Sequence, residues 1–373
     1  MQPSRDETSS ASTDFAEFPG STITPDVSVI VPARNEEVCI GACLESLFMQ
    51  DGVLCEIIVV DDGSTDRTAE IAKSFRDVRV VEAGPLPRGW SGKSNAAAAG
   101  ARIARGRWLL FTDADTVHLP GSLARALAEI KEHGAALLSY SPQQELHGVV
   151  QRAVMPVIFA ELASSYRPKE VCDPNCAAAA ANGQYLLISR AAYDALGGHA
   201  AIAHTLLEDV ELAAAAKRRG GRLRFRYGGD AVVTRMYRSF AQLREGWTKN
   251  LVLLFPSPTR LALVRLAEFL AIVGGATVVV VTPRTRTTTF LAGAATLVVF
   301  ARFLRRIGKA HAGVVSTALS LFGLPLFSYL LLRSRLYYKW NRVTWKGRRY
   351  AMPQPGHDAA AAAARSACPA TGE

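Results

Sequence analysis

Short runs of β-branched residues alternate with helix-forming stretches over residues 26–116, and this alternation constrains the fold more than any other feature. The runs read VSVIVPA, CEIIVVDD, VRVVEA and RWLLFTDADT, with stretches such as NEEVCIGACLESLFMQ, TDRTAEIAKSFRD and KSNAAAAGARIA between them. Strands that are apolar throughout are buried on both faces, which is typical of parallel sheets covered by helices. The sequence therefore predicts an α/β fold with a mainly parallel sheet.

Polar residues follow three of the predicted strands, at positions 32–36, 61–66 and 113–116. In open α/β sheets, ligands bind beyond the carboxyl ends of the strands. Carboxylates at several strand ends add nothing to the stability of a buried sheet. Their recurrence therefore indicates a ligand site along one edge of the sheet.

Asp113 and Asp115 lie one residue apart, just past the fourth predicted strand. Two acids at this spacing can share a divalent cation and a ribose hydroxyl. Hard oxygen ligands suit Mg²⁺ or Mn²⁺, which commonly bridge to substrate phosphates. A solvated loop is the alternative for this motif taken alone, but the neighbouring strand ends favour a metal site.

Two further segments supply groups for a nucleotide. In the turn DDGSTD at residues 61–66, Asp62 can accept hydrogen bonds from a base N–H, while Ser64 or Thr65 caps the next helix. Lys93 is expected at a helix start, where its ammonium and the backbone N–H groups could face phosphate. The spacing of a Walker A loop is absent.

Glu208 and Asp209 are expected at the start of another helix, in TLLEDVELAAAAKRRG. Acids at a helix N-terminus often only stabilise the macrodipole. The functional alternative is a general base that takes a proton from a substrate hydroxyl. Trp247 lies beside basic residues and suits a sugar or diphosphate face, or equally a buried anchor.

The C-terminal third is apolar. Residues 261–281 and 312–332 are each long enough to cross a bilayer, and residues 287–300 would be so only if extended through Arg302. Three spans would carry the basic segment 333–350 to the far side, against the positive-inside tendency. Either one segment is re-entrant, or residues 149–166 also enter the membrane.

The chain carries 43 Lys and Arg against 33 Asp and Glu, a net charge of +10 that suggests an anionic partner. Because the basic segment 333–350 adjoins apolar stretches, we expect it to bind anionic headgroups and expect no nucleic acid partner. No apolar signal stretch opens the sequence, so a cytoplasmic catalytic domain on a multi-pass protein of the cell membrane is expected.

The ordered motifs VSVIVPARNEE, EIIVVDDGSTDRT, GKSNA, FTDADT, NGQYLLISRAAYDALGGH and LLEDVELA resemble the family 2 glycosyltransferases over residues 26–255. This resemblance implies a nucleotide-diphospho-sugar transferase (GT-A-like) sandwich. Within the family, PLPRGWSGKSNA and the late VTWKGRRY look like the membrane enzymes that glycosylate carotenoid acids, hopanoids and related lipids.

The resemblance also implies roles for individual residues. It places the nucleotide at Pro32, Arg34, Glu36, Asp61, Asp62, Lys93 and Asp113, the metal at Asp113 and Asp115, the donor sugar or acceptor at Asn182, Gly183, Gln184 and Trp247, and the catalytic acids at Asp209 and Glu208. Processive members carry Gln/Arg-x-x-Arg-Trp, whereas this chain reads LREGW at residues 243–247. The departure favours transfer of one sugar over polymer synthesis.

The expected organisation is a disordered N-terminus (1–24), a catalytic domain (25–255, with nucleotide-binding half 25–145 and acceptor half 146–255), transmembrane helices (256–335), and a basic segment with a low-complexity tail (336–373). The expected activity is inverting transfer of one sugar from a nucleotide-diphospho-sugar to a hydroxyl or carboxyl of a lipid acceptor, with Mn²⁺ or Mg²⁺. The alternatives are a sugar-nucleotide pyrophosphorylase, which should open with a Gly-rich basic loop that VPARNEE lacks, and a membrane scaffold with a lapsed site.

Overall fold

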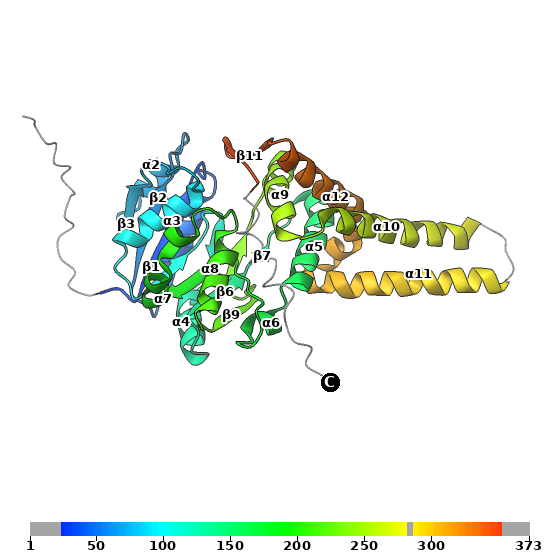
Figure 1. Ribbon diagram of the computed structural model, residues 1–373, viewed down its shortest axis with the longest axis horizontal. Helices are drawn as coiled ribbons and strands as arrows, with labels where there is room; N and C mark the ends of the chain where they lie inside the picture. Colours follow the sequence, from blue (N-terminus) through cyan, green and yellow to red (C-terminus); the bar gives the residue numbers. More distant parts are fainter. Residues whose placement is uncertain (1–23, 282–285, 353–373) are drawn as a thin grey trace, which may run out of the picture.

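The computed structural model describes residues 24–281 and 286–352. The expected disordered N-terminus and low-complexity tail lie outside these residues, apart from residue 24 and the basic part of the C-terminal segment. The molecule consists of a rounded α/β body at one end and a layer of long helices at the other, from which a helical hairpin projects (Figure 1).

A seven-stranded sheet forms the centre of the α/β body, in the order β3–β2–β1–β4–β8–β6–β9. Its strands are β1 (Val27–Ala33), β2 (Cys55–Asp61), β3 (Val78–Glu82), β4 (Trp108–Phe111), β6 (Leu137–Ser141), β8 (Leu186–Ser189) and β9 (Leu223–Tyr227). Neighbours pair in parallel except that β8 is antiparallel to both β4 and β6. The mainly parallel α/β sheet is therefore confirmed, with one reversed strand that the sequence did not indicate.

Helices cover both faces of this sheet because its strands are apolar on both sides. Val27, Val29 and Val31 of β1 pack on one face, whereas Ile30 packs on the other. One face is covered by α1 (Ile40–Phe48), α2 (Thr68–Lys73) and α4 (Ser122–Glu132), and the other by α3 (Gly92–Ile103), α7 (Arg190–Leu196) and α8 (Glu208–Arg218). The result is a three-layer sandwich.

Helix α1 begins at Ile40, later than the sequence pattern predicts, because the preceding residues cross-link two loops instead of forming a first turn. Asn35 adopts a φ of 52°, and its side-chain oxygen accepts the Thr65 N–H at 2.8 Å. The Glu36 N–H in turn donates to Thr68 Oγ1 at 2.7 Å. The sequence predicted that Ser64 or Thr65 would cap α2, but neither residue does so. Asp66 accepts the Thr68 N–H at 3.0 Å instead.

A small sheet in the order β5–β10–β7 extends the body beside the main sheet. It comprises β5 (Thr116–His118), β7 (Gln143–Gln144) and β10 (Val232–Thr234), and the short helices α6 (Pro168–Cys172) and η1 (Gly198–Ile202) lie in the neighbouring connections. Because β5 directly follows the Asp113–Asp115 loop, this sheet fixes the far end of that loop.

The helical layer has its own apolar core. It is built from α5 (Gly148–Ser165), α9 (Phe240–Leu254), α10 (Pro258–Val281), α11 (Arg286–Ile307), the turn η2 (Gly308–Ala310) and α12 (Val314–Lys339). Helix α5 lies in the middle of this core, with Val154, Val157 and Ile158 fully buried. The stretch 149–166, which the sequence left open as a membrane segment, therefore packs inside the protein.

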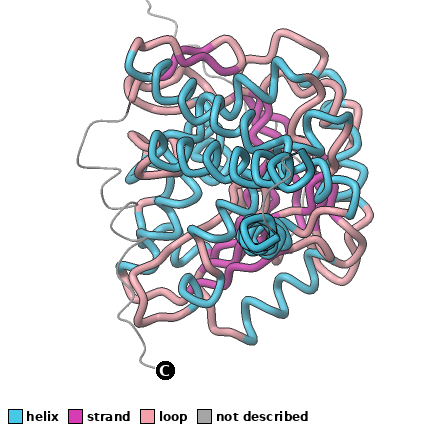
Figure 2. The backbone as a smooth tube through the Cα atoms, turned by 90° about the vertical axis from the view of Figure 1, so that its right-hand side faces the viewer, coloured by secondary structure: helices cyan, strands magenta, loops and turns pink. Residues whose placement is uncertain are grey.

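Helices α10 and α11 form an antiparallel hairpin that leaves the body (Figure 1) and points toward the viewer in Figure 2. Two helices of the described chain, Pro258–Val280 and Val314–Lys339, are long and apolar enough to cross a membrane. They differ in burial, because in the most apolar 18 residues of each helix 6% of the first and 44% of the second is buried. Helix α12 is thus largely a helix of the body, and α10 is not.

A closed set of four charges ties the base of this hairpin to α5. Arg265 and Arg306 lie among Glu161 and Glu268, and all four side chains are at most 16% exposed. Arg306 donates to both oxygens of Glu268, at 2.9 and 2.7 Å, and lies 3.0 Å from Glu161 Oε1. The network is electrically neutral, which permits its burial.

Replacing Arg306 with methionine is expected to destabilise the protein by about 3–5 kcal/mol, because two buried carboxylates would then share one arginine. The measurement is thermal unfolding of the detergent-solubilised protein, in which the midpoint should fall clearly. Arg302→Met is the matched control, because Arg302 is exposed on the same helix. Equal midpoints for the two variants would show that the network contributes no stability.

Candidate active site

The carboxyl ends of β1, β2 and β4 bring the predicted acids to one edge of the sheet. Asp62 follows β2 and is 7% exposed, and its N–H donates to Ala33 O at the end of β1. Asp113 and Asp115 follow β4, whose strand pairs with β1 on the other side. The parallel register therefore gathers residues that lie about fifty positions apart in sequence.

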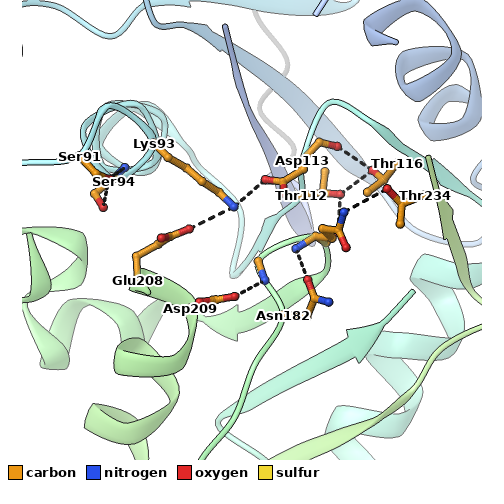
Figure 3. Close-up of polar contacts among 12 residues, drawn as sticks. Ser91, Lys93, Ser94, Thr112, Asp113, Thr116, Asn182, Glu208, Asp209 and Thr234 are labelled. Atoms are coloured by element: carbon orange, nitrogen blue, oxygen red, sulfur yellow. Dashed lines mark hydrogen bonds and ion pairs between the residues drawn. The ribbon is translucent and has the colours of Figure 1, made fainter. Parts of the chain in front are cut away.

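Lys93 reaches from the first turn of α3 to the centre of the site (Figure 3). Its Nζ lies 2.7 Å from Asp113 Oδ1 and 3.1 Å from Glu208 Oε1. Burial alone would lower the pKa of Lys93, but the carboxylates of Asp113, Glu208 and Asp209 outweigh it and raise the pKa well above its ordinary value. Lys93 is therefore a fixed cation that joins the nucleotide side to α8.

Asp209 faces the same space from the first turn of α8, as predicted. Its Oδ2 accepts the Gly183 N–H at 2.8 Å, and its Oδ1 accepts the Val210 N–H at 2.8 Å. Burial, and then the charge of Glu208, raises the pKa of Asp209 to about 6. An ionised carboxylate oxygen has room for further donors, so Asp209 can take a proton from a bound hydroxyl near neutral pH.

Glu208 has a different environment from its neighbour. Burial alone would raise its pKa, but Lys93 and then Lys249 outweigh it and lower the pKa below the ordinary value. Glu208 therefore stays ionised and paired, which suits a residue that holds Lys93 in place rather than a residue that moves a proton.

Asp115 is the acid whose surroundings fit a metal ion. Its Oδ1 is buried and has no hydrogen-bond partner. Burial, followed by the charges of Asp113 and Glu36, raises its pKa to about 7. Within the described chain no three His, Cys, Asp or Glu side chains gather closely enough to enclose a metal by themselves. Mg²⁺ and Mn²⁺ sites often use one or two carboxylates together with substrate phosphates, so Asp115 with Asp113 suffices.

Residues 182–184 form a tightly held loop opposite the acids. The Asn182 N–H donates to Ser139 Oγ at 2.7 Å, and Asn182 Oδ1 accepts the Gln184 N–H at 3.0 Å. The Gln184 side-chain amide donates to Thr234 Oγ1 at 3.0 Å, so it is committed to the protein. Gly183 lies between these two residues, and its Cα faces Lys93 and Asp209.

A chamber of about 700 Å³ extends from the acids into the helical layer. At its inner end lie Asp113, Lys93 and Asp209, and its walls carry apolar side chains of α5 and α9. Its other end is formed by the α11–α12 connection, at Arg305, Gly308, Lys309, Ala310 and His311. Its size is in the range of small-molecule sites, and its walls are more apolar than a sugar alone would need.

Trp247 and Lys249 are two of the α9 residues that line this chamber. Trp247 is 2% exposed and donates its indole N–H to Met155 Sδ at 3.2 Å, so the buried-anchor alternative describes it and only its ring faces the chamber. Lys249, which sequence analysis missed, is a partly buried cation beside Glu208. Burial lowers the pKa of Lys249.

A hairpin near the C-terminus covers the nucleotide side of the site. It consists of β11 (Val343–Trp345) and β12 (Arg348–Tyr350), joined by Lys346 and Gly347, both with positive φ, as a two-residue turn requires. Arg348 binds the Asp62 carboxylate through both terminal nitrogens. Lys346 donates to Glu36 and, at 2.9 Å, to Arg34 O.

The hairpin corrects one prediction for two basic residues and adds both of them to the site. The basic segment 333–350 was expected to bind anionic headgroups, but Lys346 and Arg348 pair with Glu36 and Asp62 instead. The guanidinium of Arg333 lies over the Tyr337 ring, 3.7 Å from its centroid. The sequence signal for Lys346 and Arg348 was the absence of acids in this segment, which predicts anionic partners but does not say where these partners lie.

The remaining predicted residues have mixed surroundings. Pro32 lines a small cavity beside Lys93 and Asp113. Arg34 donates to the backbone oxygens of Asp62 and Gly63, and therefore braces the turn after β2. The Asp61 carboxylate accepts the Ser64 N–H at 3.2 Å within the same turn. Arg34 and Asp61 thus shape the nucleotide side in this structure through the backbone.

Gly183→Ala is expected to reduce turnover by about 100-fold, since small displacements of catalytic groups have effects of this size. An added Cβ would lie 2.7 Å from Lys93 Nζ and 3.5 Å from Asp209 Oδ2, so Lys93 would have to leave its two carboxylates. Steady-state kinetics with thermal unfolding measure this. Gly274→Ala is the control, because its Cβ would meet nothing within 4 Å. Unchanged kinetics in Gly183→Ala would contradict the placement of Lys93.

The sequence profile described as "Glycosyl transferase family 2" matches residues 28–178, which contain β1 through α6 and all three acids at the strand ends. Residues 28–178 form a family 2 glycosyl transferase domain. The match supports the recognised family for the part of the chain that contains the nucleotide side of the site.

Curated relatives extend the similarity beyond this domain. The chain is 30% identical over 233 residues to a "4,4'-diaponeurosporenoate glycosyltransferase" of Staphylococcus aureus strain USA300, and 31% identical to the protein of that name from strain MRSA252. Each alignment covers 60% of this chain and 60% of the relative. The matched part therefore spans less than two thirds of these relatives.

A solved structure shares the architecture of the family 2 domain and its helical layer. The "Mannosyltransferase PcManGT from Pyrobaculum calidifontis in complex with GDP-Man and Mn2+" has a TM-score of 0.50 at 19% identity, over 86% of this chain and 89% of that chain. At this identity the likeness concerns the fold. It confirms the GT-A-like sandwich predicted from the sequence.

Proposed function

We propose that the protein is an inverting glycosyltransferase that moves one sugar from a nucleotide-diphospho-sugar to a hydroxyl or carboxyl of a lipid acceptor. The observation that carries this proposal is the meeting of two groups across one cavity. Asp113 lines its nucleotide side and Asp209 its acceptor side, with Lys93 between them. Asp115 follows Asp113 by two residues in the same loop. A donor diphosphate and an acceptor hydroxyl would then lie on opposite sides of the anomeric carbon.

Asp113 and Asp115 would hold a divalent cation, Mn²⁺ or Mg²⁺, together with the diphosphate. When bound, such a cation neutralises the charge that develops on the departing nucleoside diphosphate. The Mn²⁺ in the mannosyltransferase with the same fold supports this assignment. Asp62 would contact the base. Because Arg348 already donates to both carboxylate oxygens of Asp62, a base N–H would have to donate to the same oxygens.

Asp209 would take the proton of the acceptor hydroxyl while the acceptor oxygen attacks the anomeric carbon. Attack from the side opposite the leaving diphosphate inverts that centre. The loop 182–184 would border the donor sugar through Gly183, and the ring of Trp247 would form part of the acceptor wall. Glu208 would position Lys93.

The apolar walls of the chamber and the names of the Staphylococcus aureus relatives support a lipid acceptor. The protein would lie in the cell membrane through α10 and α11, crossing it more than once, with the family 2 domain on the cytoplasmic side. The catalytic unit would comprise residues 25–255. The family 2 match speaks against a sugar-nucleotide pyrophosphorylase, and the presence of every acid speaks against a lapsed scaffold.

The test is release of nucleoside diphosphate by detergent-purified protein with a panel of nucleotide sugars and Mn²⁺, with and without bacterial lipid extract. Release that requires one donor and increases with lipid would identify the donor and establish lipid glycosylation. Release that requires one donor but ignores lipid would remove the lipid acceptor and keep the transferase. Well-folded protein that releases nothing from any donor would contradict the proposal.

A further inference from the structure

The C-terminal end of α11, next to the outer end of the chamber, carries cations that no carboxylate of the described chain pairs with. Arg302, Arg305 and Lys309 are exposed, whereas Arg306 between them belongs to the buried network. The Lys309 ammonium has a neutral partner, Ser164 Oγ at 3.2 Å. The spacing of the three residues places them on one side of the helix end, and we call them the basic rim.

The hairpin beyond this rim has the surface of a membrane segment. Phe290, Leu297 and Leu270 are 74%, 68% and 59% exposed, and they come from both helices. Residues 269–281 and 287–301 contain no charged side chain. As helix, each stretch rises about 20 Å, which is most of the roughly 30 Å hydrocarbon core of a bilayer. Soluble proteins rarely expose so much apolar surface.

The order of apolar and basic residues along the hairpin matches the order of hydrocarbon and headgroups in a bilayer. Apolar residues lie farthest from the body, and the basic rim follows at the base of α11. Gly308, Ala310 and His311, next to the rim, line the outer end of the chamber. Phosphates of anionic lipids attract basic residues placed next to an inserted segment. Like charges at this spacing repel one another unless an anion lies against them.

We propose that the basic rim binds the anionic headgroups of one membrane leaflet while the α10–α11 hairpin enters its hydrocarbon, so that the chamber opens at the headgroup layer. The acceptor would then pass from the bilayer into the chamber beside Gly308 and reach Asp209 without crossing water. This second half rests on the proposed function, whereas the membrane contact does not.

The membrane contact is tested by flotation of the full-length protein with vesicles of phosphatidylcholine alone or mixed with phosphatidylglycerol. The triple charge reversal Arg302→Glu, Arg305→Glu, Lys309→Glu should lower phosphatidylglycerol-dependent binding by about 100-fold or more, at about fivefold per basic residue. The matched control is Lys73→Glu, Arg102→Glu, Lys131→Glu, three exposed residues of the α/β body with the same change of net charge. Its binding should equal that of the wild type.

Two outcomes would overturn the membrane contact. In one, the rim variant and the control bind anionic vesicles equally. In the other, the wild type ignores vesicles and forms dimers, which would mean that the hairpin pairs with a second copy of the chain.

Gly308→Trp tests passage of the acceptor. A Cβ at Gly308 would meet nothing within 4 Å, so an indole there should narrow the opening without straining the backbone. Sugar transfer to lipids of a bacterial extract in vesicles should fall at least tenfold, while slow hydrolysis of the nucleotide sugar stays unchanged. Unchanged lipid transfer would exclude this path. If the wild type transfers no sugar to lipid, the proposed function fails and the acceptor path fails with it, whereas flotation still decides the membrane contact.

Discussion

Asp115→Asn should lower metal-dependent turnover by about 1,000-fold and should not weaken the fold. The variant keeps the shape of the side chain but loses the charge on a buried oxygen that has no partner in the protein. Stabilisation of a departing diphosphate by a cation contributes several kcal/mol, which corresponds to this change in rate. Steady-state turnover across Mn²⁺ concentrations measures the effect, and full activity in the variant would remove Asp115 from the metal site.

The same variant has a readout that does not need turnover. The folded-state pKa of Asp115 is about 7, above the ordinary value of 3.8, so the folded protein binds the proton more tightly than the unfolded chain. Stability of the metal-free wild type should therefore fall as pH rises from about 4 to about 7, and Asp115→Asn should remove this decrease. Mn²⁺ should raise the melting temperature of the wild type and not that of the variant. Asp194→Asn, an exposed acid on α7, is the control and should behave as the wild type.

Asp209→Asn should retain donor binding and lose transfer to a hydroxyl acceptor by about 10²–10⁴-fold, the usual contribution of a general base. The asparagine can still accept one of the two backbone N–H groups, from Gly183 or Val210, but cannot take a proton. Glu211→Gln is the control, because Glu211 is another buried acid in the first turn of α8 and pairs with Arg218 at 2.7 Å. Comparable losses in both variants would indicate damage to the helix start instead of loss of a base.

The pH dependence of transfer gives an independent measure of Asp209. A base with a pKa of about 6 is ionised above that value, so kcat/KM should decrease as pH falls through about 6. The decrease should be absent from the residual activity of Asp209→Asn. Transfer that stays constant from pH 8 to pH 5 would show that the acceptor needs no base, as expected for a carboxylate that is already ionised.

The α/β body was predictable because the apolar composition of its strands shows that they are buried on both faces. The run at Val27–Ala33 is apolar on both faces, and β1 has the same bounds in the structure. The start of α1 was predicted wrongly because Asn35 and Glu36 bond to residues of the next loop, near Thr65 and Thr68. No local pattern reports a partner thirty positions away.

The site was predictable where it depends on strand ends and helix starts, as for Asp115, Lys93 and Asp209. It was not predictable where it depends on long-range pairing of charges. The basic residues Lys346 and Arg348 follow apolar helices, and membrane headgroups and protein carboxylates are equally good partners for such residues in sequence. The structure chooses between them because α12 turns back along α5 and α9 and returns the chain to the α/β body.

This return also sets the order in which the protein can mature. Arg348 is separated from Asp62 by 286 positions, and Lys346 from Glu36 by 310. Because synthesis proceeds from the N-terminus and domains fold as they emerge, the α/β body can form while its two nucleotide-side acids still lack their basic partners. These partners leave the ribosome only after α10, α11 and α12 have been made. The donor site can therefore be completed only on a chain whose helical layer has already been made. A chain truncated before this point would contain the α/β body with Asp62 and Glu36 unpaired.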